Sequence, residues 1–192
     1  MKKILLMAGV ASVLTLGATV KAQAGYLNDF YNEMRPYVGA DYVYSRIKFG
    51  SPAVHMKKNY NSGMVNLGAR MYENFGLETF YQQSGKAKRT YDGEKHSAKF
   101  LAYGADIYGY APLMCTSLNL IGSVGMANYR FDFKYPDVAN KRQNRIGYRA
   151  GIGMQYDLTE HLAARVVGRY SYVGMKRVNN LKEVTAGLRY TF

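Results

Sequence analysis

The last ten residues of the chain constrain its fold more than any other stretch. From Glu183 to Phe192, polar or glycine residues alternate strictly with apolar ones. A period of two is typical of a β-strand, in which successive side chains point to opposite faces. One face is purely apolar and ends in Tyr190 and Phe192, whereas the other carries Glu183, Gly187 and Arg189. The chain is therefore expected to end in a strand with two chemically opposite faces.

The composition of these faces predicts which one meets the surroundings. Glycine suits a crowded polar interior, because in an ordinary exposed strand it costs entropy and packs against nothing. Apolar residues outside and polar residues inside are stable only in hydrocarbon, where a closed barrel pairs every backbone amide. We therefore expect a transmembrane β-barrel. The alternative is a soluble lipid-binding barrel, whose strands alternate equally well but turn the apolar face inward.

The C-terminal sequence Arg189-Tyr190-Thr191-Phe192 also resembles the terminal signature of bacterial outer-membrane β-barrels. In strand pattern and size, the mature chain resembles the small opacity-type barrels related to the barrel domain of outer-membrane protein A. This resemblance implies a location in the outer membrane of a Gram-negative bacterium. It also implies that the barrel-assembly machinery reads Phe192 as its signal.

The N-terminus has the three parts of a secretory signal peptide. Two lysines follow Met1, an apolar run extends from Ile4 to Val20, and Ala22-Gln23-Ala24 provides a small-x-small cleavage site. We predict a cleaved signal peptide at residues 1–24, a short periplasmic segment at 25–34 and an outer-membrane β-barrel at 35–192. An even number of strands would return both termini to the periplasm.

Alternating segments along the rest of the chain predict an all-β fold of about eight antiparallel strands. Long polar connectors are expected to form outer loops at 46–60, 84–96, 130–143 and 174–180. Short connectors are expected to form periplasmic turns at 73–76, 109–116 and 157–161. The strand at 118–128 has a weak pattern, and its outward residues are expected to be Leu120, Gly122, Val124 and Met126. The 19 tyrosines fit the aromatic girdles of such barrels.

Many charged residues fall on the polar faces of the expected strands. The interior of an eight-stranded barrel is just wide enough for side chains, so buried charges must pair and hydrogen-bond. The expected lumen charge network consists of Asp41, Arg70, Glu78, Asp106, Arg145, Arg149, Arg165, Arg169, Glu183 and Arg189, with Lys99 as a further inward cation. We expect this network to plug the lumen. Because its basic groups outnumber its acidic ones, a narrow, weakly anion-preferring, porin-like channel is the alternative.

The chain is strongly basic, with a formal net charge of +13. Removing the three lysines of the signal peptide leaves 13 − 3, or +10. A secretory signal directs the chain away from nucleic acid, so that partner is not expected. The expected partners are outer-membrane lipid and lipopolysaccharide, and acidic host glycans or a host surface protein. The candidate surface-ligand residues in the outer loops are Lys57, Lys58, Lys86, Lys88 and Arg89.

No catalytic, cofactor or metal site is expected from the sequence. His55 and His96 lie near serines in expected loops, but no motif surrounds them, and nearness in sequence does not establish the geometry of a triad. Cys115 is the only cysteine, so no intrachain disulfide can form. We predict a plugged barrel that serves as a surface interaction protein, an adhesin or a structural membrane component, and not as an enzyme.

Overall fold

The structure is a computed structural model that describes residues 34–50, 58–71, 74–91, 94–113, 117–134, 141–175 and 178–192. The expected signal peptide at 1–24 and residues 25–33 of the expected periplasmic segment lie outside these ranges. Residues Arg35–Phe192 form one compact unit. Within the described ranges, no helix is long and apolar enough to cross a bilayer.

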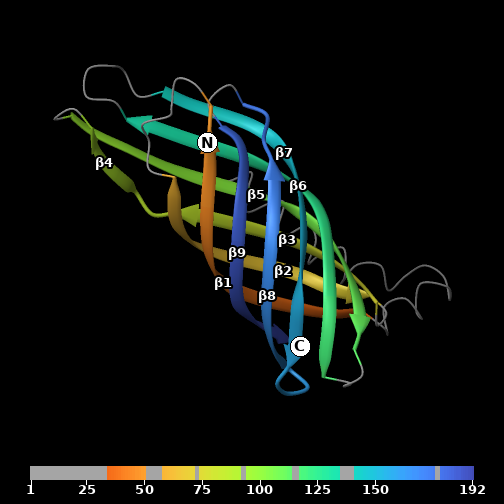
Figure 1. The fold of residues 1–192 in the computed structure, drawn as a ribbon. Coiled ribbons are helices and arrows are strands. Elements are labelled where there is room, and N and C mark those ends of the chain that lie inside the picture. The colour runs from red at the N-terminus through yellow and green to blue at the C-terminus, as the bar shows by residue number, and fades with distance from the viewer. Residues whose placement is uncertain are drawn as a thin grey trace, which may run out of the picture. The chain divides into compact units, whose positions relative to one another are not determined.

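The described chain consists of antiparallel strands (Figure 1). The strands are β1 (Met34–Phe49), β2 (Asn59–Met71), β3 (Phe75–Ser84), β4 (Ala87–Tyr91), β5 (Glu94–Pro112), β6 (Leu118–Lys134), β7 (Lys141–Asp157), β8 (Leu162–Tyr172) and β9 (Val178–Thr191).

The sheet closes on itself. β1 pairs with β9 in a register that sets Tyr37 opposite Thr191 and Ile47 opposite Leu181. β3 and β4 both pair with β5, so β4 occupies the same position in the wall as β3, beyond a break at Gly85. The wall therefore has eight strand positions, and closure leaves no free edge along the β1–β9 seam. The predicted eight-stranded antiparallel barrel is confirmed.

Alternation places side chains as expected on the two faces of the wall. On β9, Val184 and Leu188 are half exposed on the outside, whereas Glu183 and Arg189 are buried inside. The weakly patterned strand also has the predicted phase, because Val124 is 60% exposed and its neighbour Ser123 is buried. The outer face of the barrel is therefore apolar and its inner face polar, which is the arrangement required in a membrane.

This polarity reverses toward one end of the barrel. We call the end where β1 starts and β9 finishes the terminal end, and the opposite end the loop end. Toward the loop end of β1, the outward residues change from Tyr44 to Arg46 and Lys48, while the inward residues change from Asp41 to Ile47. A wall with polar residues outside and apolar residues inside is stable in water. The barrel therefore has a membrane section and a water-exposed section.

The reversal corrects the predicted loops. β1 runs to Phe49, and β2 starts at Asn59, so the expected loop at 46–60 is partly strand. The expected loop at 84–96 contains the β4–β5 hairpin, and the loop at 130–143 is shortened by β6 and β7. Similarly, β9 begins inside the expected loop at 174–180, and β5 extends into the expected turn at 109–116. Toward the loop end, the strands continue because their alternation persists after its polarity has changed, whereas the extension of β5 lies at the opposite, terminal end.

The inside of the water-exposed section is an apolar cap. Its large members include Tyr60, Phe100, Tyr129, Phe131 and Leu181, each at most 3% exposed. The ring of Phe100 lies edge-on to that of Tyr60, with the two centroids 5.7 Å apart. The centroids of the Phe100 and Phe131 rings are 5.5 Å apart. Aromatic packing of this kind fills the interior at the loop end.

Candidate functional site

The most distinctive feature of the interior is a layer of buried charges. Among the described residues, four carboxylates and four guanidinium groups, contributed by six strands of the wall, are each at most 7% exposed. We call this set the ionic layer, and its members are Asp41, Glu78, Asp106, Glu183, Arg149, Arg165, Arg169 and Arg189. The formal charges within it are balanced. Charges this deep are stable only when they are paired and hydrogen-bonded.

Glu78 is the centre of the ionic layer. Arg165 donates to its two carboxylate oxygens from Nη2, at 2.8 and 2.7 Å. The hydroxyls of Tyr37 and Tyr108 also donate to it, at 2.9 and 3.3 Å. The Nε atom of Arg189 lies 3.5 Å from Oε2 of the same carboxylate. A single carboxylate thus joins residues from β1, β5, β8 and β9.

Arg189 and Asp41 form a second pair across the closing seam of the barrel. The guanidinium donates from Nη1 and Nη2 to the two oxygens of Asp41, each at 2.8 Å. The Asn66 side chain donates to Asp41 Oδ2, also at 2.8 Å. A bidentate arginine–carboxylate pair fixes both distance and orientation. This pair therefore ties the first strand of the barrel to the last.

The remaining arginines are held by mixed contacts. Arg149 lies 3.0 Å from Asp106 and stacks over the ring of Phe80, 3.9 Å from its centroid. Arg169 donates to the hydroxyl of Tyr108 and, at 3.3 Å, to that of Thr185. Cation–π stacking stabilises a desolvated guanidinium without a second carboxylate.

Glu183 is held by neutral donors. Ser45 Oγ and Gln82 Nε2 donate to its Oε1 at 2.8 and 2.9 Å. These two partners come from β1 and β3, so this carboxylate too links strands that are distant in sequence.

Inward glycines make room for the ionic layer. A β-carbon at Gly39 would lie 2.5 Å from Arg189 Cδ, and one at Gly151 would lie 2.8 Å from Arg169 Cγ. A β-carbon at Gly187 would collide with Asp41 and with the backbone of β1. The sequence feature that first indicated a polar interior therefore has a steric cause, because each glycine provides space for a charged neighbour.

Two residues of the predicted lumen network lie outside the ionic layer. Arg145 is exposed, because its neighbours across the strands belong to the apolar cap, where Tyr129 is its partner in β6. Arg70 is half-buried near the terminal end and stacks over Tyr110 at 4.5 Å. Lys99 was also expected to face inward, but it lies on the outward face, 3.8 Å from Asp132. The other eight predicted network residues are buried in the ionic layer.

Several functional neighbours of these charges were missed by sequence reasoning. Tyr37, Tyr108, Ser45, Asn66 and Gln82 all donate hydrogen bonds to buried carboxylates. The alternation of these residues with outward ones indicated that their side chains face inward. It did not indicate their partners, which lie between 25 and 138 positions away in the chain. Such pairs depend on barrel closure and stagger.

The candidate surface-ligand residues are located toward the loop end, as far as the structure describes them. Lys58 precedes β2 and Lys86 precedes β4, and both side chains are exposed. The backbones of Lys88 and Arg89 lie in β4, without described side chains, and Lys57 lies outside the described residues.

Phe192, the expected assembly signal, lies exposed at the terminal end. Its amide donates to the carbonyl of Pro36 at 3.0 Å, the residue is 68% exposed, and its ring lies edge-on to that of Tyr190. His161 contacts the carbonyl of Thr191 through Nδ1 at 3.0 Å. In the described part of the chain, no group of three or more histidine, cysteine, aspartate or glutamate side chains is placed to hold a metal.

Residues 9–192 match the family model described as "Outer membrane protein beta-barrel domain". The chain belongs to this outer-membrane β-barrel family. It is thus an outer-membrane protein of the Gram-negative type, whose strands cross the membrane. Among curated protein sequences, none matches the chain.

Solved structures of outer-membrane barrels share this fold. Neisserial surface protein A is 16% identical, with a TM-score of 0.63, over 83% of this chain and 97% of that one. A second structure is Ail, the attachment invasion locus protein of Yersinia pestis, in complex with the heparin analogue sucrose octasulfate. It is 15% identical, with a TM-score of 0.61, and the match covers 83% of this chain and 99% of Ail. OprG of Pseudomonas aeruginosa is 18% identical, with a TM-score of 0.55, over 83% and 96%. At these identities the likeness shows the fold alone.

Proposed function

We propose that this outer-membrane barrel is a surface interaction protein, or adhesin, whose lumen is plugged and whose binding residues lie at the loop end. The observation that carries the proposal is the filled interior. Paired charges occupy the membrane section, and the apolar cap occupies the water-exposed section beyond it. Buried salt bridges and close aromatic packing oppose the passage of solutes, so the function is assigned to the outer surface.

We further propose that the loop end faces the cell exterior and that both termini are periplasmic. The connections at the terminal end are short, as at residues 158–161 between β7 and β8. The connections at the loop end include the longer stretches 50–58 and 135–140. Short periplasmic turns and longer extracellular loops are the rule in this class of barrel.

The loop end carries an exposed basic surface. Arg46 of β1 and Lys182 of β9 are direct partners across the seam, and both point outward. Lys48 follows on the same face, and Lys58 lies close by, because its carbonyl accepts a hydrogen bond from the Ile47 amide at 2.8 Å. Like charges directly opposite each other are destabilising unless an anion lies between them. An anionic partner is therefore the chemistry that this surface fits.

The proposed ligands are acidic: host glycans, an acidic host surface protein, or the phosphates of lipopolysaccharide. The complex of Ail with a heparin analogue supports the choice of a sulfated glycan as the first probe. We expect charge reversal of Lys57, Lys58, Lys86, Lys88 and Arg89 together to weaken binding to immobilised heparin by at least about ten-fold at physiological salt. Heat-modifiable electrophoretic mobility serves as the control for assembly. Unchanged binding by an assembled variant would refute the assignment of these residues.

A narrow anion-preferring channel is the competing function. Among the described residues, the buried charges are four acidic and four basic, so the ionic layer itself supplies no anion preference. Planar-bilayer recording of the assembled barrel should show no conductance above that of the empty bilayer. Reproducible anion-selective conductance steps would refute the plugged barrel and support the channel.

A further inference from the structure

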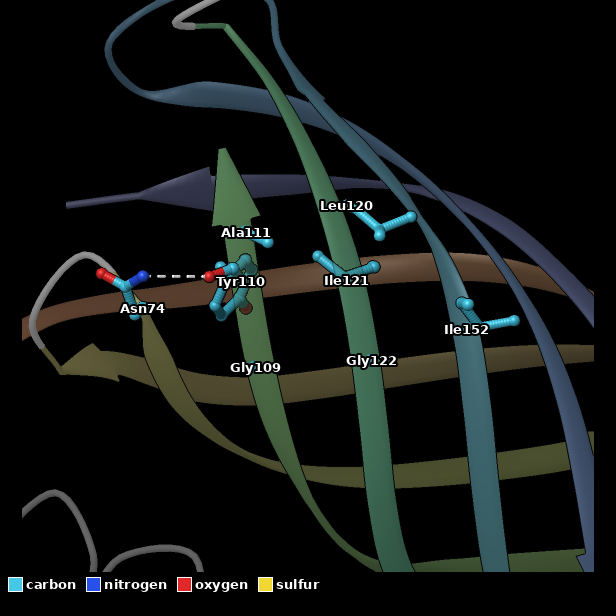
Figure 2. A pocket seen from close by; sticks show the side chains of 8 residues that line it. All are labelled: Asn74, Gly109, Tyr110, Ala111, Leu120, Ile121, Gly122 and Ile152. Atoms are coloured by element: carbon cyan, nitrogen blue, oxygen red, sulfur yellow. Dashed lines mark hydrogen bonds between the residues drawn. The ribbon is translucent and has the colours of Figure 1, made fainter. Parts of the chain in front are cut away.

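Two glycines lie side by side on the outer wall of the membrane section. Gly109 of β5 and Gly122 of β6 are direct cross-strand partners, and both face outward. They form the floor of a groove of about 310 Å³ whose lining also includes Asn74, Ala111, Leu120 and Ile152. Figure 2 shows Leu120 and Ile152 projecting from β6 and β7 beside this floor.

Large apolar side chains surround the groove. In the same cross-strand row, Phe75 pairs with Gly109, and Ile152 pairs with Gly122. The next row toward the loop end pairs Ile107 with Val124. All four side chains are substantially exposed on the outer face. The groove is therefore a bounded depression in the part of the wall that faces hydrocarbon.

The two glycines are not required by packing within the chain. A β-carbon at either position would meet no atom within 4 Å. The inward glycines differ, because Gly39 and Gly187 are each crowded by a buried charge. Glycine weakens a strand, and in a strand interior it often marks the close approach of a ligand. Gly168 is similarly open but stands alone, whereas the adjacent Gly109 and Gly122 together leave a depression that can receive a ligand from outside the chain.

A polar side chain, that of Asn74, lies at one end of this apolar groove. Asn74, in the connection before β3, donates from Nδ2 to the carbonyl of Tyr110 at 3.3 Å (Figure 2). Its backbone carbonyl accepts a hydrogen bond from the Tyr110 amide at 2.9 Å. These two bonds fix the residue against β5. A side-chain amide has a second N–H and an oxygen acceptor, which can bind an ester group. The groove thus combines an apolar floor and walls with a polar group at the terminal end.

We propose that this groove binds one acyl chain of a phospholipid, with the ester region of the lipid near Asn74. The surrounding medium supplies acyl chains, and the polarity of the groove matches the order of acyl chain and ester along a lipid. A second copy of the barrel fits less well, because the floor is only two residues wide between projecting side chains. The leaflet rests on the orientation proposed above: with the termini in the periplasm, the lipid belongs to the inner leaflet of the outer membrane. This inference does not depend on the proposed adhesin function.

The test fills the groove and measures lipid contact. The barrel is reconstituted with phosphatidylethanolamine that carries a photoreactive diazirine on one acyl chain, and the adducts are mapped by mass spectrometry. We expect adducts to concentrate on residues 107–124. Gly122→Val should reduce them about ten-fold, because its methyl groups occupy the space of the acyl chain. Gly168→Val is the matched control, since Gly168 also faces outward in open space but does not line the groove.

Each outcome decides the proposal. Loss of adducts in Gly122→Val but not in Gly168→Val supports the proposal. It is also supported if unlabelled phosphatidylethanolamine reduces adduct formation and a detergent of equal chain length does not. Adducts spread evenly over the outer wall overturn it. Equal competition by the detergent also overturns it, because no ester recognition is then involved. Chain-to-chain cross-links at 107–124 would assign the groove to a second copy instead.

Discussion

The ionic layer and the apolar cap are built on the same strands, with the same inward alternation, but with opposite chemistry. On β9, Glu183 faces into the ionic layer, and two residues earlier Leu181 faces into the cap. On the outside, Val184 gives way to Lys182 over the same step. The inside and the outside of the wall therefore change together.

This difference shows that the surrounding medium, and not the strand, determines which side chains can be buried. In hydrocarbon, the outward residues must be apolar, and the polar residues are left to fill the lumen with pairs. In water, the outward residues can carry charge, and burial of apolar surface then stabilises the interior. The step from residue 181 to residue 184 therefore marks the membrane boundary on β9.

The largest effect is expected from Glu78→Leu in the ionic layer. The substitution removes the carboxylate partner of Arg165 and an acceptor for Tyr37 and Tyr108, and leaves a buried guanidinium with only the ring of Tyr108 beside it. Breaking a buried pair in this way should reduce the free energy of unfolding by about 3–5 kcal/mol. Urea unfolding of the barrel in lipid vesicles measures this loss.

The double variant Glu78→Leu with Arg165→Met tests the origin of that effect. If the loss comes from the orphaned charge, removing the arginine as well should recover at least half of the lost stability. A double variant as unstable as the single one would mean that the tyrosine contacts, and not the ion pair, stabilise this part of the lumen.

A somewhat smaller and more local effect is expected from Phe100→Ala in the apolar cap. The ring packs against Tyr60 and Phe131, and deleting a buried phenylalanine costs about 3 kcal/mol. Hydrogen exchange should speed up at backbone amides near the loop end of β5 and β6, while amides beside the ionic layer stay protected. Phe100→Leu should cost about 1 kcal/mol, because less volume is lost. Equal deprotection of both regions would show that the two sections unfold as one unit.

The contrast between the two regions also explains what the sequence could predict. A period of two survives any change of medium, so apart from Lys99 the inward and outward positions were assigned correctly, even in β6, where Val124 and Met126 face outward. The expected loops were too long because a polar outward residue such as Arg46 or Lys48 was taken as the end of a strand. Arg145 was misplaced for a different reason: it keeps the inward phase of β7, but the interior beside it is already apolar.

The partners of the buried charges could not be predicted in the same way. Tyr37 and Glu78 are 41 positions apart, and Arg189 and Asp41 are 148 positions apart. Both pairs are set by the stagger between strands and by closure of β1 on β9, which local alternation does not encode. Most members of the ionic layer could therefore be predicted from the sequence, but their hydrogen-bond and ion-pair partners could not.

The smallest effect is expected from a glycine pair that compares the inside of the wall with its outside. Gly187→Ala places a methyl group against Asp41 and the backbone of β1 at the Arg189–Asp41 pair, and overpacking of this kind costs about 1–3 kcal/mol. Gly168→Ala, whose nearest atom would be the Ile152 carbonyl oxygen at 3.8 Å, should be neutral or stabilising by up to about 1 kcal/mol. Urea midpoints of the two variants measure the difference. If Gly187→Ala is as stable as Gly168→Ala, the inward glycines do not make room for the ionic layer, and their place on the polar face needs another cause.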